Sequence, residues 1–291
     1  MTTSFKRRTP GDVAFGAINA AILTLLAIIM FYPFWHEVCI SLSAATEATR
    51  GGIFILPRKF TVEAYQMVFK NAFVWTAYQN SLFCAALVTV IGTMASAMLA
   101  YALSKRNVAG SKSISFLVTF CMIFNGGLIP TYLVIKSLGL VDSLWAIILP
   151  VAVTPYNTII MKNFFSSLPD ELEEAAFIDG AGPLRIFFQI VLPLSKAVLA
   201  TIALWLVVAS WNNFQGPLIY INERIRYTLP LYVRQVIDGQ LISRMTGEGA
   251  KAAVESVVGA TIIVTILPVI CVYPFLQKYF VKGVMIGSVK G

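Results

Sequence analysis

The stretch ELEEAAFIDGAGPLRIFFQIVLP, residues Glu171–Pro193, is a charged and glycine-marked interruption in a chain that is otherwise mostly apolar. Ser167 and the acids that follow it favour the start of a helix, because side-chain oxygens cap free N–H groups and acids stabilise the positive end of the helix dipole. Gly180 and the Gly182-Pro183 pair end this helix after about ten residues. We therefore predict a short charged helix within the loop 167–193.

The surface of this helix favours a close contact with another protein. Glu174 and Ile178 are four residues apart and therefore share one face. Ala175 and Ala176 have small side chains, so a partner can approach the neighbouring surface closely. The loop is the place where we expect another component to engage this chain.

The composition is that of a membrane protein. Hydrophobic residues make up 58% of the chain and charged residues 12%, and the mean hydropathy is +0.78, whereas soluble domains are about a quarter charged. The formal net charge is +8, but the basic residues are spread between apolar stretches, which argues against nucleic-acid binding. The four cysteines show no spacing for a metal site or a disulfide framework.

Six charge-free apolar stretches are each about long enough to span a bilayer as a helix. They are residues 13–34, 81–103, 114–135, 144–161, 197–221 and 257–276. Lipid cannot satisfy an open backbone, so the sequence predicts an all-α membrane protein in which residues 1–291 form a single domain of six transmembrane helices. Glycines and prolines such as Gly126-Gly127, Pro150 and Pro155 predict kinks or breaks in several of them.

Six spans place both chain ends on the same side of the membrane. The basic residues at positions 6–8 precede the first span and Lys105-Arg106 follow the second, so the positive-inside rule predicts cytoplasmic N- and C-termini. Residues 36–80 and 222–255 then form two outer loops. The mixed basic and apolar tail 277–291 is predicted to dock on a partner.

The fifth span ends in a polar group formed by Trp211, Asn212 and Asn213. Polar side chains at membrane depth are costly and usually face a wet cavity or a partner, so these residues are candidates for a translocation path or for contact with a paired subunit. Hydrogen bonding between helices is the alternative. Tryptophan and amides also suit a sugar, whose ring stacks on aromatics and whose hydroxyls donate and accept. Asn125, beside two glycines in the third span, is a further candidate for the path.

Catalytic and nucleotide-binding motifs are absent from the sequence. No stretch fits GxxxxGK[ST], so the chain is not expected to bind and split ATP on its own. His36 is the only histidine, which excludes a zinc-protease motif and leaves a Ser/His hydrolase without support. We predict a transport pore that is not an enzyme, binds no cofactor or metal and is driven by another component.

The loop described first resembles the cytoplasmic signature of the permease subunits of bacterial binding-protein-dependent ABC importers. The family pattern is EAA, three residues, Gly, nine residues, Ile-x-Leu-Pro. It is matched by Glu174, Ala175, Ala176, Gly180, Ile190, Leu192 and Pro193. The stretch 126–140, the segment at Trp211 and the ending Val289-Lys290-Gly291 are similar to the carbohydrate-uptake branch of the maltose type.

This resemblance implies a type I ABC importer permease fold in the bacterial inner membrane. Two permeases would form the pore, two ATPase subunits would bind ATP and magnesium beneath it, and a soluble binding protein would deliver a carbohydrate from outside. Glu174 would pair with a basic group of the ATPase, the two alanines would allow close packing, and Gly180 would make the turn. The ending Val289-Lys290-Gly291 would reach the ATPase dimer interface, and the second outer loop would reach toward the binding protein's sugar site.

The substrate is open between a neutral and an acidic sugar. Related sugar permeases commonly have an acid after Trp-Asn, where this chain has Asn213, so an ion pair is not expected there. Basic residues in the second outer loop would tolerate an acidic oligosaccharide such as a uronide. An ion-coupled secondary transporter is the alternative function, but it would need a charged residue within the spans, and the six stretches contain none.

Overall fold

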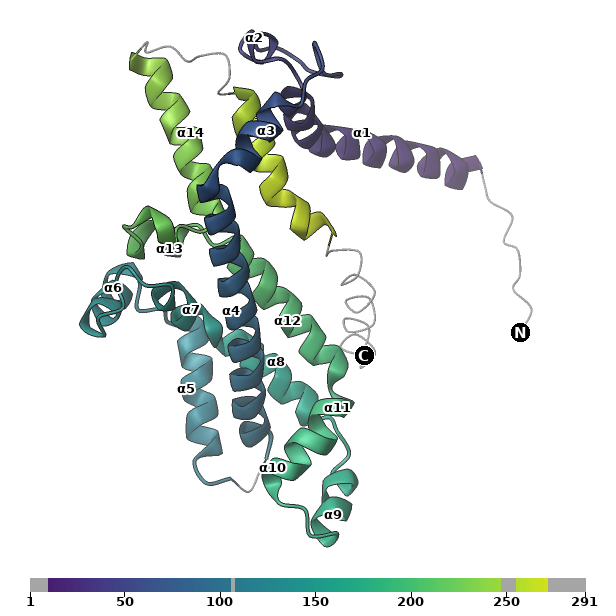
Figure 1. Ribbon diagram of the computed structural model, residues 1–291. Coiled ribbons are helices and arrows are strands. Elements are labelled where there is room, and N and C mark those ends of the chain that lie inside the picture. Colours follow the sequence, from purple (N-terminus) through teal and green to yellow (C-terminus); the bar gives the residue numbers. More distant parts are fainter. Residues whose placement is uncertain (1–9, 106–107, 247–254, 272–291) are drawn as a thin grey trace. The chain divides into compact units, whose positions relative to one another are not determined.

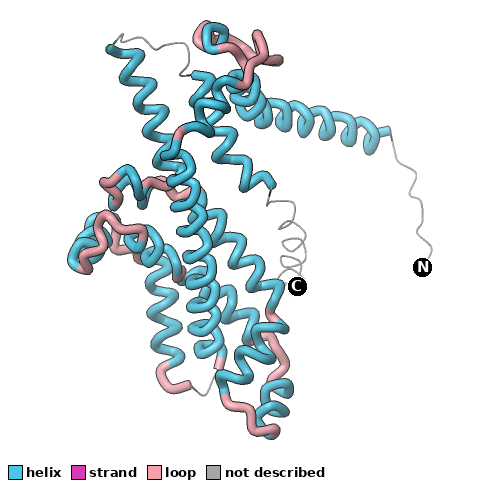
Figure 2. Tube along the Cα trace, in the orientation of Figure 1, coloured by secondary structure: helices cyan, strands magenta, loops and turns pink. Residues whose placement is uncertain are grey.

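Figures 1 and 2 show a computed structural model of the chain, which describes residues 10–105, 108–246 and 255–271. Within these ranges every named element is a helix, and a single isolated antiparallel bridge joins Ser43 to Phe60. This confirms the predicted all-α class. The chain divides into two compact units, one built from Met1–Lys70 and Val236–Val264, the other from Asn71–Gln235 and Thr265–Gly291.

The first unit is organised around the C-terminal end of a long apolar helix. Its helices are α1 (Pro10–Ser41), α2 (Ala45–Ala48), α3 (Glu63–Lys70) and most of the helix Glu255–Cys271. Its buried cluster contains Cys39 and Ile40 from the last turns of α1, together with Ala48 and Phe54. Because α1 continues to Ser41, the segment predicted as an outer loop from residue 36 begins about six residues later.

The second unit contains the larger core. Its helices are α4 (Ala72–Ser104), α5 (Ser111–Ile123), α6 (Leu128–Ser137), α7 (Trp145–Ala152), α8 (Pro155–Phe165), α9 (Glu171–Ile178), α10 (Pro183–Ile186), the π-helix η1 (Phe187–Val191), α11 (Leu192–Leu194), α12 (Lys196–Trp211), α13 (Gln215–Tyr220), the 3₁₀ turn η2 (Arg224–Arg226) and the first turns of α14 (Leu229–Thr246). α4 packs against α7, α8 and α12. Val88, Ile148 and Ile202 are almost completely buried in this core.

One close approach in the core requires a glycine. A Cβ atom added to Gly92 of α4 would lie 2.2 Å from the backbone oxygen of Ala152 and 2.8 Å from Cδ1 of Leu206. Real Cβ atoms do not come this close to a backbone oxygen, so only glycine lets α4 and the end of α7 touch here.

The six predicted spans differ in how continuous they are. Among the described residues, α1 and α4 are each long and apolar enough to cross a membrane, and up to four spans result if each bent helix pair counts as one. The stretch 114–135 divides into α5 and α6, between which the chain bends by 118°. The stretch 144–161 divides into α7 and α8 before Pro155, which has no N–H to continue the helix. The predicted breaks at Gly126-Gly127 and before Pro155 are confirmed, whereas Pro150 lies inside α7 without breaking it. The count of six spans stays a prediction.

The second outer loop has more regular structure than expected. The predicted loop 222–255 contains η2 and the 18-residue helix α14. Conversely, the predicted span 197–221 is interrupted, since α12 ends at Trp211 and α13 begins at Gln215.

Candidate functional site

The charged loop starts its helix later than the sequence suggested. The helix α9 begins at Glu171, and Asp170 occupies the N-cap position without making a side-chain cap. Ser167 does not cap this helix. Its hydroxyl donates instead to the carbonyl oxygen of Phe164, at 2.7 Å, in the last turn of α8. Ser167 therefore belongs to the end of the preceding helix.

Gly180 ends α9 in a left-handed conformation. Its φ is +80°, which an L-residue with a Cβ rarely adopts. The N–H of Gly180 donates to the carbonyl oxygen of Phe177 at 3.0 Å, and that of Ala181 donates to Ala176 at 2.9 Å. These two bonds form a Schellman motif, which satisfies carbonyls that the helix end would leave unpaired.

A charged contact joins α9 to the C-terminal end of α4. Nζ of Lys105 lies 2.5 Å from Oε1 of Glu173. The hydroxyl of Tyr101 donates to Oε2 of the same carboxylate at 3.2 Å, and the Lys105 ammonium lies 5.1 Å from the centre of the Tyr101 ring. The side chains of Lys105 and Glu173 are 28% and 16% exposed, so this charge-assisted contact is partly shielded from water.

The two alanines of the signature point in different directions. Ala176 is buried in the core of the second unit, while Ala175 is exposed. The expectation that both alanines allow close packing with a partner stays a prediction, and Ala175 is the one of the two that is exposed. Ala176 packs within this chain, and only Ala175 offers surface to another protein.

The outer face of α9 combines acids with large apolar side chains. Glu174 is exposed, and Ile178 is 87% exposed one turn further on. Phe177 and Leu184 are 61% and 68% exposed. Exposed apolar side chains beside a carboxylate are typical of a surface that another protein covers.

Ile190, Leu192 and Pro193 lie where the chain turns from the loop into α12. Ile190 and Leu192 pack against the core. Pro193 lies two residues after the end of the π-helix η1, in α11, and the chain bends by 82° between the segment Pro183–Leu194 and α12. A proline ring does not fit a regular helix interior, so the wide π turn and the corner at Ser195 accommodate it.

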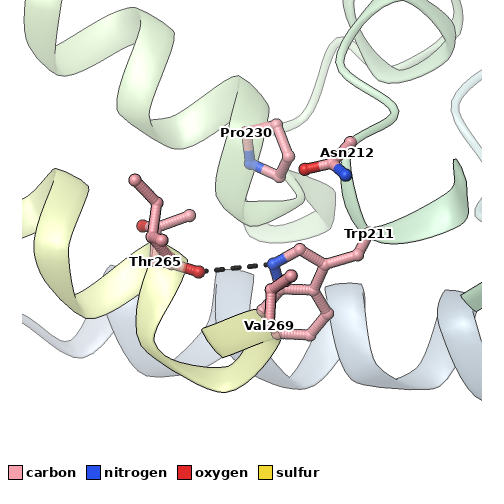
Figure 3. A pocket seen from close by; sticks show the side chains of 6 residues that line it. Trp211, Asn212, Pro230, Thr265 and Val269 are labelled. Carbon is pink, nitrogen blue, oxygen red and sulfur yellow. Dashed lines mark hydrogen bonds between the residues drawn. The ribbon is translucent and has the colours of Figure 1, made fainter. Parts of the chain in front are cut away.

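Trp211 and Asn212 lie at one pocket in the second unit (Figure 3). The indole N–H of Trp211 donates to the backbone oxygen of Thr265 at 3.3 Å, and its ring meets that of Tyr78 edge-on at 5.7 Å. The pocket has a volume of about 190 Å³. It is lined by Trp211, Asn212, Pro230, Thr265, Ile266 and Val269, none of which is charged. An uncharged pocket with an indole wall and an amide can hold part of a polyol or sugar.

Asn213 and Asn125 are used locally. Oδ1 of Asn213 accepts from the N–H of Gly216 at 3.0 Å, in the first turn of α13. Oδ1 of Asn125 accepts from the N–H of Gly127 at 2.9 Å, in the break between α5 and α6. Both amides thus stabilise helix breaks, and of the four predicted path residues only Trp211 and Asn212 line the pocket.

A family model described as binding-protein-dependent transport system inner membrane component matches residues 17–286. The chain belongs to this family. This permease is 42% identical to protein LplC of Bacillus subtilis (strain 168) over 290 residues, which is 97% of each chain. It is 39% identical to the polygalacturonan/rhamnogalacturonan transport system permease protein YtcP of the same organism, over 95% of this chain and 98% of YtcP.

A solved structure shares the permease fold. It is the crystal structure of a bacterial ABC transporter involved in the import of the acidic polysaccharide alginate. The match has a TM-score of 0.87 and 33% identity, and it covers 94% of this permease and 99% of the other chain. The recognition as an ABC importer permease is confirmed, and the ion-coupled alternative is not supported.

Sequence reasoning missed a second charged cluster in the permease. Asp142 has φ +60°, and its Oδ1 accepts from the N–H groups of Asn222 at 3.0 Å and Glu223 at 3.1 Å. Its Oδ2 lies 2.9 Å from Nη1 of Arg226. The hydrogen bond from the Glu223 N–H, with that from Asn222 and the Arg226 charge, holds the pKa of Asp142 below its ordinary value. A signal was present, because Asp142 is the only acid between Glu63 and Asp170.

The segment after α13 is also fixed to the first turns of α4. Nδ2 of Asn80 donates to the backbone oxygens of Ile225 at 2.8 Å and Tyr227 at 3.0 Å. The N–H of Leu229 donates to Oγ of Ser81 at 2.8 Å. Together with the Asp142 cluster, these bonds hold residues 222–229 in one conformation. The predicted contact residues Val289, Lys290 and Gly291, in the tail 277–291, lie outside the described residues.

Proposed function

We propose that this permease is one pore-forming subunit of an ATP-driven importer that moves a carbohydrate across the bacterial inner membrane, with both of its termini in the cytoplasm. A second permease would complete the pore. Two ATPase subunits would bind ATP and magnesium on the inner side, and a soluble binding protein would deliver the substrate. The permease itself would bind no cofactor and perform no catalysis.

The arrangement of α9 is the observation that carries this proposal. Glu173 and Ala176 attach the helix to the permease, which leaves Glu174, Ala175 and Ile178 facing outward. In a groove of an ATPase subunit, Glu174 would pair with a basic side chain while Ile178 packs against apolar walls. The ATPase would then be able to push and pull α9 as a rigid element.

The bend near Pro193 connects α9 to α12 and could transmit such a movement toward the pore. The chain runs from α9 through the segment Pro183–Leu194 into α12 without a long flexible linker. α12 ends at Trp211, which lines the pocket. A displacement of α9 would therefore reach a residue of the proposed substrate path.

We propose an acidic oligosaccharide as the substrate. Two proteins to which the permease is similar over nearly its whole length are named for polygalacturonan/rhamnogalacturonan and alginate. The uncharged pocket at Trp211 supports a neutral sugar as the second candidate. Uptake into vesicles that contain the full transporter separates the two. We expect radiolabelled oligogalacturonate to accumulate faster than a neutral oligosaccharide of the same length. Accumulation of the neutral compound alone would refute the acidic substrate and leave the import function standing.

Charge reversal at Glu174 tests the coupling role of α9. We expect Glu174→Lys to reduce copurification of the ATPase subunits and to abolish substrate-stimulated ATP hydrolysis, because a lysine would repel the basic group of the partner. Glu63→Lys, an equivalent reversal at an exposed position of α3 in the predicted outer segment, is the matched control. If Glu174→Lys left coupling unchanged, α9 would not be the ATPase contact. Transport that persisted without any ATPase would refute the ATP-driven importer.

A further inference from the structure

The chain after α1 folds back along the helix that it has just left. The indole N–H of Trp35 donates to the backbone oxygen of Ile55 at 2.8 Å, and Nε2 of His36 lies 3.2 Å from the backbone oxygen of Gly52. Because α1 continues to Ser41, Trp35 lies roughly 9 Å before the helix end at 1.5 Å per residue. The segment 52–55 thus returns toward the apolar part of α1.

The returning segment exposes large apolar side chains. Phe54 is completely buried against Cys39, Ile40 and Ala48. Its neighbours Ile53 and Ile55, and the next residue Leu56, are each 70% exposed. The loop therefore uses one side chain to attach itself to α1 and directs three others away from the core.

The depth of these side chains follows from α1. Its uninterrupted apolar stretch, residues 13–34, is about 33 Å long as a helix, close to the ~30 Å thickness of the hydrocarbon core. Trp35 comes directly after this stretch, and tryptophan is enriched at the boundary between the hydrocarbon and the headgroups. The bond from Trp35 to Ile55 places the exposed apolar residues at the same level.

Basic residues surround the apolar ones. Arg50, Arg58 and Lys59 belong to the same loop, and Glu47 contacts two of them, at 3.1 Å to Arg50 and 3.0 Å to Lys59. A hydrogen bond from Lys59 holds the pKa of Glu47 below its ordinary value, so this acid stays charged and cancels only one of the three cations. The side chains of Arg50 and Lys59 are 71% and 72% exposed.

We propose that residues 50–59, the anchor loop, insert Ile53, Ile55 and Leu56 into the outer leaflet of the membrane and hold anionic lipid headgroups with the surrounding basic residues. Apolar side chains with adjacent arginine and lysine are the composition that binds the surface of an anionic bilayer. A second permease would cover the apolar side chains but would leave the excess of positive charge unexplained. The anchor loop fixes the outer end of α1 at a defined depth and goes beyond the transport function.

Depth-dependent quenching tests the proposal. The full transporter is reconstituted in nanodiscs, with its permease carrying the environment-sensitive fluorophore NBD on Ile55→Cys in a background whose four native cysteines are replaced by alanine. Thr46→Cys, at an exposed polar position of α2, is the matched control. We expect lipids with a nitroxide near the headgroup to quench the label at position 55 several-fold more than the label at position 46. Equal and weak quenching at both positions would overturn the proposal.

A second comparison tests the charge and the identity of the occupant. We expect quenching at position 55 to be stronger in nanodiscs with about a third phosphatidylglycerol than in pure phosphatidylcholine, and Arg58→Gln/Lys59→Gln to remove most of this difference. No dependence on phosphatidylglycerol in the parent would overturn the lipid pairing. A photoreactive residue at position 55 that cross-links to the second permease instead of to lipid would overturn the membrane insertion itself.

Discussion

The contact between α4 and α9 gives a prediction that separates two neighbouring acids of the loop. Glu173 pairs with Lys105 at 2.5 Å and accepts from Tyr101 at 3.2 Å, while Glu174 is exposed. Replacement of Glu173 by alanine removes both bonds and leaves the Lys105 ammonium partly buried without its partner. A hydrogen bond to a charged group is worth about 1.5–3 kcal/mol, and the two bonds share one carboxylate, so we expect α9 to lose about 2–3 kcal/mol of attachment.

Hydrogen exchange of the α9 amides measures this loss directly, because the helix can detach without global unfolding. A loss of 2–3 kcal/mol corresponds to about 30- to 150-fold faster exchange for residues 173–178. Glu174→Ala should leave exchange in the isolated permease unchanged and should weaken only the association with the ATPase. The double variant Lys105→Glu/Glu173→Lys should restore part of the protection. Equal exchange in the Glu173 and Glu174 variants would refute the assignment of Glu173 as the attachment point.

Three further predictions concern single positions. Gly92→Ala should destabilise the permease by about 1–3 kcal/mol in thermal unfolding, since the new methyl group meets a backbone oxygen. Gly16→Ala, with open space around the glycine, should be neutral or slightly stabilising. Equal effects of the two substitutions would contradict the close contact at Gly92. Gly180→Ala should lower the copurification of the ATPase by misdirecting the end of α9, and an unchanged yield would show that the left-handed turn is dispensable. Asp142 has a lowered pKa, so the charged carboxylate stabilises the attachment of residues 222–229 above about pH 4, and this stabilisation is lost as the pH falls through the folded-state pKa. Cleavage near Arg226 by an acid-active protease should therefore increase over that pH range in the parent. In Asp142→Asn the cleavage should depend less on pH.

The sequence predicted the fold class well because membrane helices carry a strong and local signal. A charge-free run of about 20 residues specifies a span whatever its neighbours are. The breaks were also predictable, since proline lacks a donor and glycine favours special conformations. The angle of a break was not, because the 118° between α5 and α6 depends on how each half packs.

Some properties of the predicted site residues follow from the local sequence, and others depend on how distant segments pack. The position of Gly180 after the helix follows from backbone chemistry, and the structure places it in the expected turn. The different surroundings of Ala175 and Ala176 depend on which face of α9 packs against the core, which the motif does not state. The attachment through Lys105 joins residues 68 positions apart, a separation at which local patterns carry no information.

α4 has one more consequence for how the importer operates. It is a continuous helix of 33 residues without proline, about 50 Å long at the standard rise. The residue just past its last turn, Lys105, is paired with the loop proposed to bind the ATPase, and its first turns bind residues 222–229 through Asn80 and Ser81. Because α4 has no proline break, it has no internal hinge that could absorb a displacement of one end. A displacement of α9 by the ATPase would therefore tilt α4 as one rigid body and move its N-terminal end at the opposite membrane surface.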